Sequence, residues 1–202
     1  MIAYALFPTP LFSYTIGESA ALNQALLAQL MVGFTGAPGL AVSNHGGAWH
    51  SIPDLAMRSD PAFRLIVDHI LAAVKTTLER VAAPVTDAVG DLDYGIQMWS
   101  VIYPRGGYSA LHDHVRADWS AAYYVDAGDA PNSPTSGVIE FVDPRRVPED
   151  VAGHRIFPSS FQISPRAGEL LVFPGWLSHY VHPYLGDRPR VVVSANVTVK
   201  TR

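Results

Sequence analysis

Short runs rich in Val, Ile, Tyr and Phe fill the sequence from about Tyr94 onward and constrain its fold more than any other feature. Clusters of Gly, Pro and Asp separate them and predict turns. The runs are GIQMWSVIY, WSAAYYVD, GVIEFVD, GELLVFP and RVVVSANVTV. Residues of these types in short runs predict strands, and no helical pattern of useful length interrupts them. Many short strands that close on one another predict a jelly roll or a sandwich.

Before these runs, two helices are expected, over residues 19–32 and 60–81. Gly33 is the expected stop of the first helix, and Asp60 followed by Pro61 is a good N-cap for the second. In both helices apolar residues recur at helical intervals and predict a buried stripe. These residues are Leu22, Leu26 and Leu30 in the first helix and Phe63, Ile66, Ile70, Val74 and Leu78 in the second.

The domain organisation follows from these two halves. We expect a helical part over about residues 1–90, packed against a mainly β core over about residues 91–202. No linker, internal repeat or low-complexity segment divides them, so the α+β chain of 202 residues is expected to form a single domain.

Charge and hydropathy exclude several classes of function. The net charge is -4 and neither sign forms a long run, which argues against a nucleic-acid partner. The first residues have no basic region, and no stretch approaches the roughly 20 apolar residues of a membrane span. We therefore expect a cytoplasmic protein without a membrane anchor. A homodimer is also expected, because a jelly roll has strand edges that can pair.

The sequence contains no cysteine. Disulfides, thiolate zinc sites, iron–sulfur clusters and cysteine nucleophiles are therefore excluded. Any metal must be held by His, by carboxylates or by both.

The segment ALHDHV places His112 and His114 just before the strand candidate WSAAYYVD. In extended backbone, residues at i and i+2 point to the same side, so these two imidazoles can converge on one metal ion. Asp113 faces away and could accept a hydrogen bond from an imidazole N–H. The pair alone is also compatible with a polar surface turn.

A third imidazole decides between these interpretations. His179 follows the strand candidate GELLVFP and a Pro-Gly turn. Non-haem iron oxygenases use two ligands close together in sequence and one distant ligand. His182 competes for this role, and we favour His179 because Arg190 begins the next strand candidate, from which its guanidinium could reach the same cavity.

Arginine binds carboxylates through a planar fork, so Arg190 implies an acid cosubstrate. Alternation along the strand puts Ser194 on the same face as Arg190. The alternative for Arg190, as for Arg188, is a charge that keeps a strand edge soluble.

With these residues in view, the chain resembles the iron(II)- and 2-oxoglutarate-dependent oxygenases, in particular a bacterial branch known mainly from genome sequences. The resemblance runs nearly from end to end. The motifs that carry it are FPTPL, GGAWHS, MWSVIYPRGGYSALHDH, WSAAYYV, FVDPR, FPGWLSHYVHP and RVVVSANV.

The resemblance implies a double-stranded β-helix that holds Fe(II), with His112 and His179 as the first and last imidazole ligands. It also implies that Arg190 binds the distal carboxylate of 2-oxoglutarate. The implied reaction hydroxylates a substrate, which the match does not identify, and releases succinate and CO2. Either a small molecule or a protein side chain fits, and Trp49, Trp99 and Asp113 are the residues expected at the substrate pocket.

Two positions depart from the wider superfamily. A carboxylate usually stands where this chain has His114, so Zn or Ni becomes harder to distinguish from Fe, and Asp118 is an alternative carboxylate ligand. A hydroxyl usually stands where this chain has Val192, so Ser194, Tyr123 or Tyr124 would have to replace it. Two other functions stay open: a cupin-like metal enzyme that does not use 2-oxoglutarate, and a metal-free jelly-roll binding module.

Overall fold

The computed structural model describes residues 7–83, 91–129, 133–145, 150–155 and 158–201. The helical elements are α1 (Ser19–Gly36), the 3-10 turn η1 (Leu55–Met57) and α2 (Pro61–Ala82). The strands are β1 (Phe12–Thr15), β2 (His45–Gly46), β3 (Trp49–His50), β4 (Leu92–Tyr103), β5 (Tyr108–His112), β6 (Trp119–Asp126), β7 (Ile139–Val142), β8 (Asp150–Val151), β9 (His154–Arg155), β10 (Ser160–Ile163), β11 (Glu169–Pro174), β12 (His179–Val181) and β13 (Arg190–Thr201).

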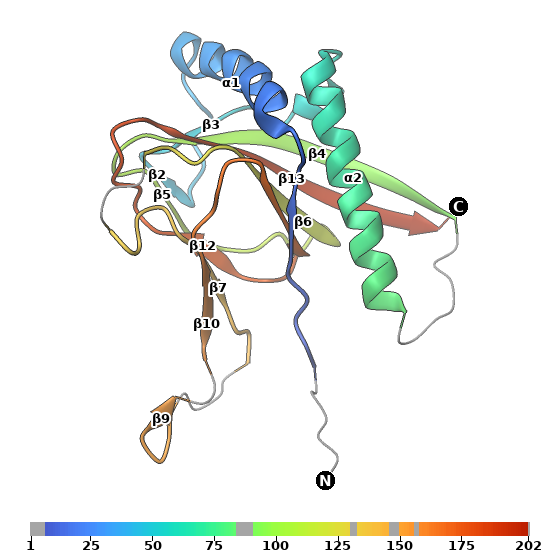
Figure 1. The fold of residues 1–202 in the computed structure, drawn as a ribbon, viewed down its shortest axis with the longest axis vertical. Coiled ribbons are helices and arrows are strands. Elements are labelled where there is room, and N and C mark those ends of the chain that lie inside the picture. Colours follow the sequence, from blue (N-terminus) through green and yellow to red (C-terminus); the bar gives the residue numbers. More distant parts are fainter. Residues whose placement is uncertain (1–6, 84–90, 130–132, 146–149, 156–157, 202) are drawn as a thin grey trace.

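Two antiparallel sheets form the body of the molecule (Figure 1). The larger has the strand order β1-β11-β6-β13-β4-β3, and the smaller has the order β10-β7-β12-β5-β2. Their facing sides share one apolar cluster, in which the rings of Phe141 on β7 and Phe173 on β11 lie 4.9 Å apart. This architecture confirms the predicted jelly roll.

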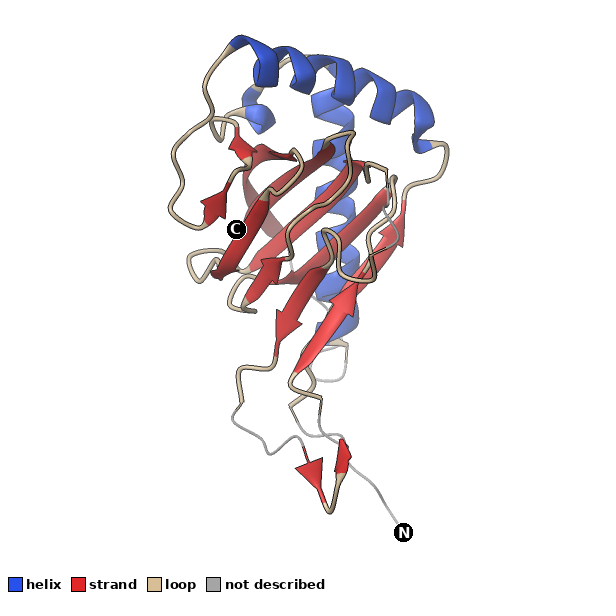
Figure 2. Cartoon of the chain, turned by 90° about the vertical axis from the view of Figure 1, so that its left-hand side faces the viewer, coloured by secondary structure: helices blue, strands red, loops and turns tan. Residues whose placement is uncertain are grey.

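The helices cover the opposite side of the larger sheet (Figure 2). Leu26 of α1 and Phe63, Ile66 and Ile70 of α2 are fully buried in a second apolar cluster with that sheet. The larger sheet is therefore apolar on both faces, which explains why runs such as WSAAYYVD carry so few exposed side chains. No helix in the part of the chain described here is long and apolar enough to cross a membrane.

The second helix forms as predicted. The Asp60 side chain accepts a hydrogen bond from the Ala62 backbone N–H at 2.9 Å, and Pro61 occupies the first helical position. Of the predicted apolar stripe, Leu78 alone is only partly buried.

The first helix extends beyond its predicted stop. It continues past Gly33 to Gly36, and the Ala37 backbone N–H then bonds to the Gly33 carbonyl oxygen. The additional turn places Phe34 edge-on against Trp49, with ring centroids 6.0 Å apart. A tertiary contact thus outweighs the local tendency of glycine to end a helix.

The expectation of a helical N-terminal part was incomplete, because the first 90 residues also supply three strands. β1 pairs with β11 at one edge of the larger sheet and β3 pairs with β4 at the other. β2 pairs with β5 in the smaller sheet. These strands are too short to show alternation, and only their partners define them.

Candidate metal centre

Strand pairing brings His112 and His179 face to face. β5 ends at His112, β12 begins at His179, and the two residues are direct partners in the antiparallel register. Their ring centroids are 4.4 Å apart. His114 follows β5, and its backbone N–H donates to the Gly175 carbonyl oxygen at 2.7 Å. The three residues offer ligand atoms that all lie within 4.8 Å of one another.

Backbone hydrogen bonds set the tautomer of two of these imidazoles. The Nδ1–H of His112 donates to the Ala110 carbonyl oxygen at 2.7 Å, and that of His179 donates to the Leu177 carbonyl oxygen at 2.9 Å. A carbonyl oxygen can only accept, so Nδ1 carries the proton and Nε2 keeps its lone pair. Both rings are therefore prepared to bind a metal through Nε2.

Burial also keeps the three imidazoles neutral. It lowers the pKa of His112, that of His114 to about 4 and that of His179 to about 3. The neighbouring His112 lowers the last two further. Because a metal ligand must be unprotonated, the site is ready for a cation at pH 7 and well below.

The neutral state of the three imidazoles can be tested by the number of protons that a metal displaces when it binds. At pH 5.5, Zn(II) uptake is expected to release fewer than about one proton in total, whereas three imidazoles with an ordinary pKa near 6.5 would release roughly three. Calorimetric titrations in two buffers with different ionisation enthalpies measure the number. Release of two or more protons would contradict the depressed pKa values.

The two rival ligands are excluded by position. The Asp118 carboxylate accepts from the Val199 backbone N–H at 2.7 Å and is exposed. His182 lies just beyond β12, and its Nε2 is 2.7 Å from the Glu140 carboxylate. Side chains alternate along a strand, so His182 faces away from the side that His179 occupies. Neither residue is part of the imidazole cluster.

The Glu140 carboxylate is the centre of a hydrogen-bond network on the outer face of the smaller sheet. Glu140 is only 7% exposed, and its carboxylate accepts from His182 and, at 2.7 Å, from the Gln162 side chain. Burial raises its pKa, but hydrogen bonds from Ser160, Tyr180, His182 and Gln162 outweigh burial and lower the pKa to about 2. The network links β7 with its two neighbours, β10 and β12, and β12 carries His179.

Glu140→Gln is therefore expected to reduce the free energy of unfolding by about 2 kcal/mol at pH 7. The carboxyl pKa falls from 4.5 to about 2 on folding, so its contribution is fully present above pH 4.5 and is lost as the pH falls towards 2. Denaturant titrations at pH 7 and pH 3 should show a smaller loss of stability on acidification than in the wild type. Glu79→Gln, on the exposed side of α2, is the matched control. An unchanged pH dependence would show that the network contributes little.

Arg190 lines the same cavity as the three imidazoles, and this cavity has a volume of about 270 Å³. The side chain is 4% exposed, and its Nη1 donates to the Gly137 carbonyl oxygen. Its Nε has no hydrogen-bond partner, and no described carboxylate forms a salt bridge with it. The guanidinium is stacked near Tyr124 and Tyr184, with distances to the ring centroids of 5.9 and 5.4 Å. A buried cation without a counter-charge is costly, and an anionic ligand would offset that cost.

The hydroxyl groups near Arg190 differ in part from those expected. Tyr124 and Ser194 line the cavity. Tyr103 also lines it, with its hydroxyl 2.8 Å from the Ser109 hydroxyl. The expectation for Tyr123 was wrong, because its hydroxyl donates to Asn23 on α1, on the helix-covered side of the sheet. Alternation along β6 gives adjacent tyrosines opposite faces, and the sequence does not show which face the second sheet covers.

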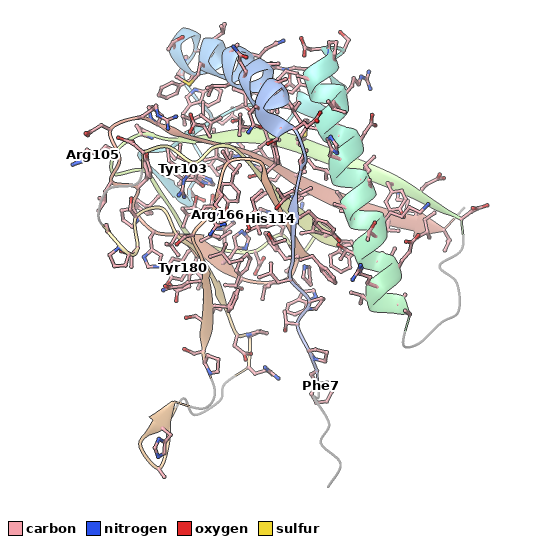
Figure 3. All side chains as sticks on the ribbon, in the orientation of Figure 1. Phe7, Tyr103, Arg105, His114, Arg166 and Tyr180 are labelled. Carbon is pink, nitrogen blue, oxygen red and sulfur yellow. The ribbon has the colours of Figure 1, made fainter. Side chains whose placement is uncertain are left out.

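Of the three residues expected at the substrate pocket, Trp99 and Asp113 line the cavity and Trp49 does not. Trp49 packs against α1, and its indole N–H donates to the Ala37 carbonyl oxygen at 3.0 Å, so it is not a pocket residue. Trp99 and the exposed Asp113 do line the cavity. Sequence reasoning missed His45 and His50 as cavity residues, although GGAWHS is one of the motifs that carry the resemblance. In Figure 3, His114 and Tyr103 lie among the strands, whereas Phe7 lies beyond them.

Comparisons with known proteins agree with this geometry. Residues 97–196 match a family model described as "Putative 2OG-Fe(II) oxygenase". None of the curated proteins matches the sequence.

Among solved structures, a Pseudomonas putida prolyl-4-hydroxylase is similar over 94% of this chain and 92% of that chain, with 19% identity and a TM-score of 0.61. HygX from Streptomyces hygroscopicus, with nickel and 2-oxoglutarate bound, is similar over 94% of this chain and 83% of that chain, with 16% identity and a TM-score of 0.60. A Trichoplax adhaerens prolyl hydroxylase, in complex with a hypoxia inducible factor peptide fragment, is similar over 93% and 83%, with 14% identity and a TM-score of 0.60. At these identities, the likenesses show a shared fold.

Proposed function

Because this chain belongs to the iron(II)- and 2-oxoglutarate-dependent oxygenases, we propose that its three clustered imidazoles hold the iron and that Arg190 binds the cosubstrate. The protein is a non-haem iron enzyme that uses 2-oxoglutarate. The observation that carries the assignment of residues is the cavity that the imidazole cluster and the buried, unpaired guanidinium share.

The donor set fits the metal. Three neutral imidazoles, two of them with the Nε2 lone pair set free by a backbone hydrogen bond at Nδ1, suit Fe(II), and they suit Zn and Ni equally well. Most non-haem iron oxygenases use two His and one carboxylate, so a third imidazole leaves one more positive charge at the ion. We propose that the dianionic cosubstrate supplies the compensating negative charge.

The surroundings of Arg190 fit the distal carboxylate of 2-oxoglutarate. Its Nε–H is available, and the hydroxyls of Tyr103, Tyr124 and Ser194 line the same cavity. A carboxylate in this position would gain charge-assisted hydrogen bonds in a site largely shielded from water. Tyr103 and Tyr124 thus take the place of the hydroxyl that is absent at Val192.

When bound, Fe(II) and 2-oxoglutarate supply the oxidising chemistry, with succinate and CO2 formed from the cosubstrate. The protein would hold and orient the reactants: the three imidazoles would bind the metal, and Arg190 would bind the distal carboxylate of the cosubstrate in the same cavity. Phe173, Ile139 and Val192 provide apolar walls that restrict water. The substrate, a small molecule or a protein side chain, would enter from the cavity side of the imidazole cluster.

The test is metal content of protein purified without chelator, followed by calorimetric titration of 2-oxoglutarate into the anaerobic Fe(II) form. About one metal per chain and micromolar binding of 2-oxoglutarate are expected. Metal uptake without 2-oxoglutarate binding would favour a cupin-like enzyme instead. Absence of both, with stability unchanged by chelation, would favour a binding module.

A further inference from the structure

Two additional imidazoles line the same cavity beside the metal ligands. His45 comes from β2 and His50 from β3. The His45 ring is 6.1 Å from His112 and 5.4 Å from His50. The His50 ring stacks on Trp99 at 5.6 Å, and Trp99 is 5.9 Å from His114. These rings form a continuous aromatic wall that begins and ends at proposed metal ligands.

Hydrogen bonds leave both added imidazoles with a free nitrogen. The His50 Nδ1–H donates to the Ser51 carbonyl oxygen at 2.6 Å, so Nε2 of the neutral ring is an acceptor. His45 Nδ1 is 3.0 Å from the Asn44 side-chain oxygen and is likewise committed. Within the described residues, neither Nε2 has a hydrogen-bond partner. The wall therefore offers two acceptors that no part of the described chain uses.

The charges of the cavity are unevenly placed. Arg190 is the only Lys or Arg among the described lining residues, and the proposed cosubstrate engages it. The only carboxylate among them is Asp113, which is exposed and lies between two metal ligands in sequence. A second carboxylate or a phosphate would find no cation here, whereas an N–H donor would find acceptors and a negative charge.

We propose that His45 and His50, with Asp113, bind a cationic nitrogen group of the substrate, an amine or a guanidinium. This inference rests on the proposed function and adds the chemical class of the substrate. The nitrogen group would be anchored on the aromatic wall, and the carbon to be hydroxylated would lie nearer the imidazole cluster. Asp113 would contribute a longer-range attraction, weakened by its exposure to water.

The test uses matched probes on protein loaded with Zn(II) and 2-oxoglutarate, in which no turnover occurs. Pentylamine, pentan-1-ol and pentanoate have equal chain lengths and differ in the terminal group. Ring signals of His45 and His50 are followed by nuclear magnetic resonance during each titration. Pentylamine is expected to shift both signals and to bind at least about tenfold more tightly than pentanoate, a difference of about 1.4 kcal/mol.

Variants separate recognition from folding. His45→Leu removes the acceptor and should weaken pentylamine binding about tenfold, whereas His45→Gln keeps an acceptor and should retain most of it. Asp113→Asn should weaken pentylamine but not pentanol. His154→Gln is the matched control, because His154 is an exposed residue of the β8–β9 hairpin, away from the sheets (Figure 1).

Calorimetry of 2-oxoglutarate in the same proteins distinguishes a failure of the proposed function from a failure of the proposed substrate class. Failure of 2-oxoglutarate to bind to the wild type would overturn the proposed function. Normal 2-oxoglutarate binding, with pentanoate bound as tightly as pentylamine or with unshifted ring signals, would overturn the substrate class alone. A second zinc ion per chain that is lost in His45→Gln would also overturn it, because the added imidazoles would then be metal ligands.

Discussion

Replacing His179 by alanine is expected to weaken metal binding by roughly 1000-fold or more, because one of three ligands is lost and the two that remain chelate poorly. His179 is 5% exposed and packs against the rings of Phe141 and Phe173, at centroid distances of 5.8 and 4.9 Å. His182, the nearest alternative along the chain, cannot take its place, because its side chain faces the opposite side of β12 and pairs with Glu140. Metal analysis and Zn(II) calorimetry measure the loss.

Two further variants make this result interpretable. His179→Ala leaves a cavity beside aromatic rings and should cost about 2 kcal/mol of stability, so His179→Gln, which fills more of the space, is tested in parallel. Both should lose the metal. His182→Ala is the control on the same chain segment and should retain it. Metal retained in His179→Ala and lost in His182→Ala would reverse the assignment of the third ligand.

Replacing Arg190 by methionine is expected to weaken 2-oxoglutarate binding by roughly 100-fold or more, because the carboxylate loses its charged, forked partner. Metal content should stay near one per chain, because the guanidinium contacts none of the imidazoles. Arg190→Lys keeps the charge but not the planar fork, so we expect an intermediate affinity. Anaerobic calorimetry on the Fe(II) form gives the 2-oxoglutarate affinities of the wild type, Arg190→Met and Arg190→Lys.

The stability of Arg190→Met should change in the opposite direction to its affinity. The native guanidinium is buried without a carboxylate partner among the described residues, and its Nε makes no hydrogen bond. An apolar side chain of similar length should therefore leave stability unchanged or raise it by about 1 kcal/mol in the absence of 2-oxoglutarate. Arg188→Met is the control, because Arg188 is 56% exposed and pairs with Asp126. Wild-type affinity for 2-oxoglutarate in Arg190→Met would remove Arg190 from the site.

Local patterns were sufficient for the longer elements. The run WSAAYYVD coincides with β6, and α2 begins at Pro61 next to its predicted cap residue, Asp60. In these segments, residue type, periodicity and turn residues all favour the same structure. Short strands were harder to predict from the sequence. β5 and β12 show little alternation of apolar and polar residues, and their pairing with each other defines them.

The sequence by itself determined the fold class, the absence of thiol chemistry, and three histidines whose spacing suits one metal ion. It also placed Arg190 and Ser194 on a shared strand face, because alternation is a local property of extended backbone. Only the tertiary structure decided which face of each strand points into the cavity. That choice depends on where the second sheet and the helices pack. It placed Tyr124 rather than Tyr123 at the cavity, and it left Trp49 and His182 outside the cavity lining. Which face of a strand is buried depends on segments that are distant in the sequence. The spacing of residues within one strand therefore does not reveal it.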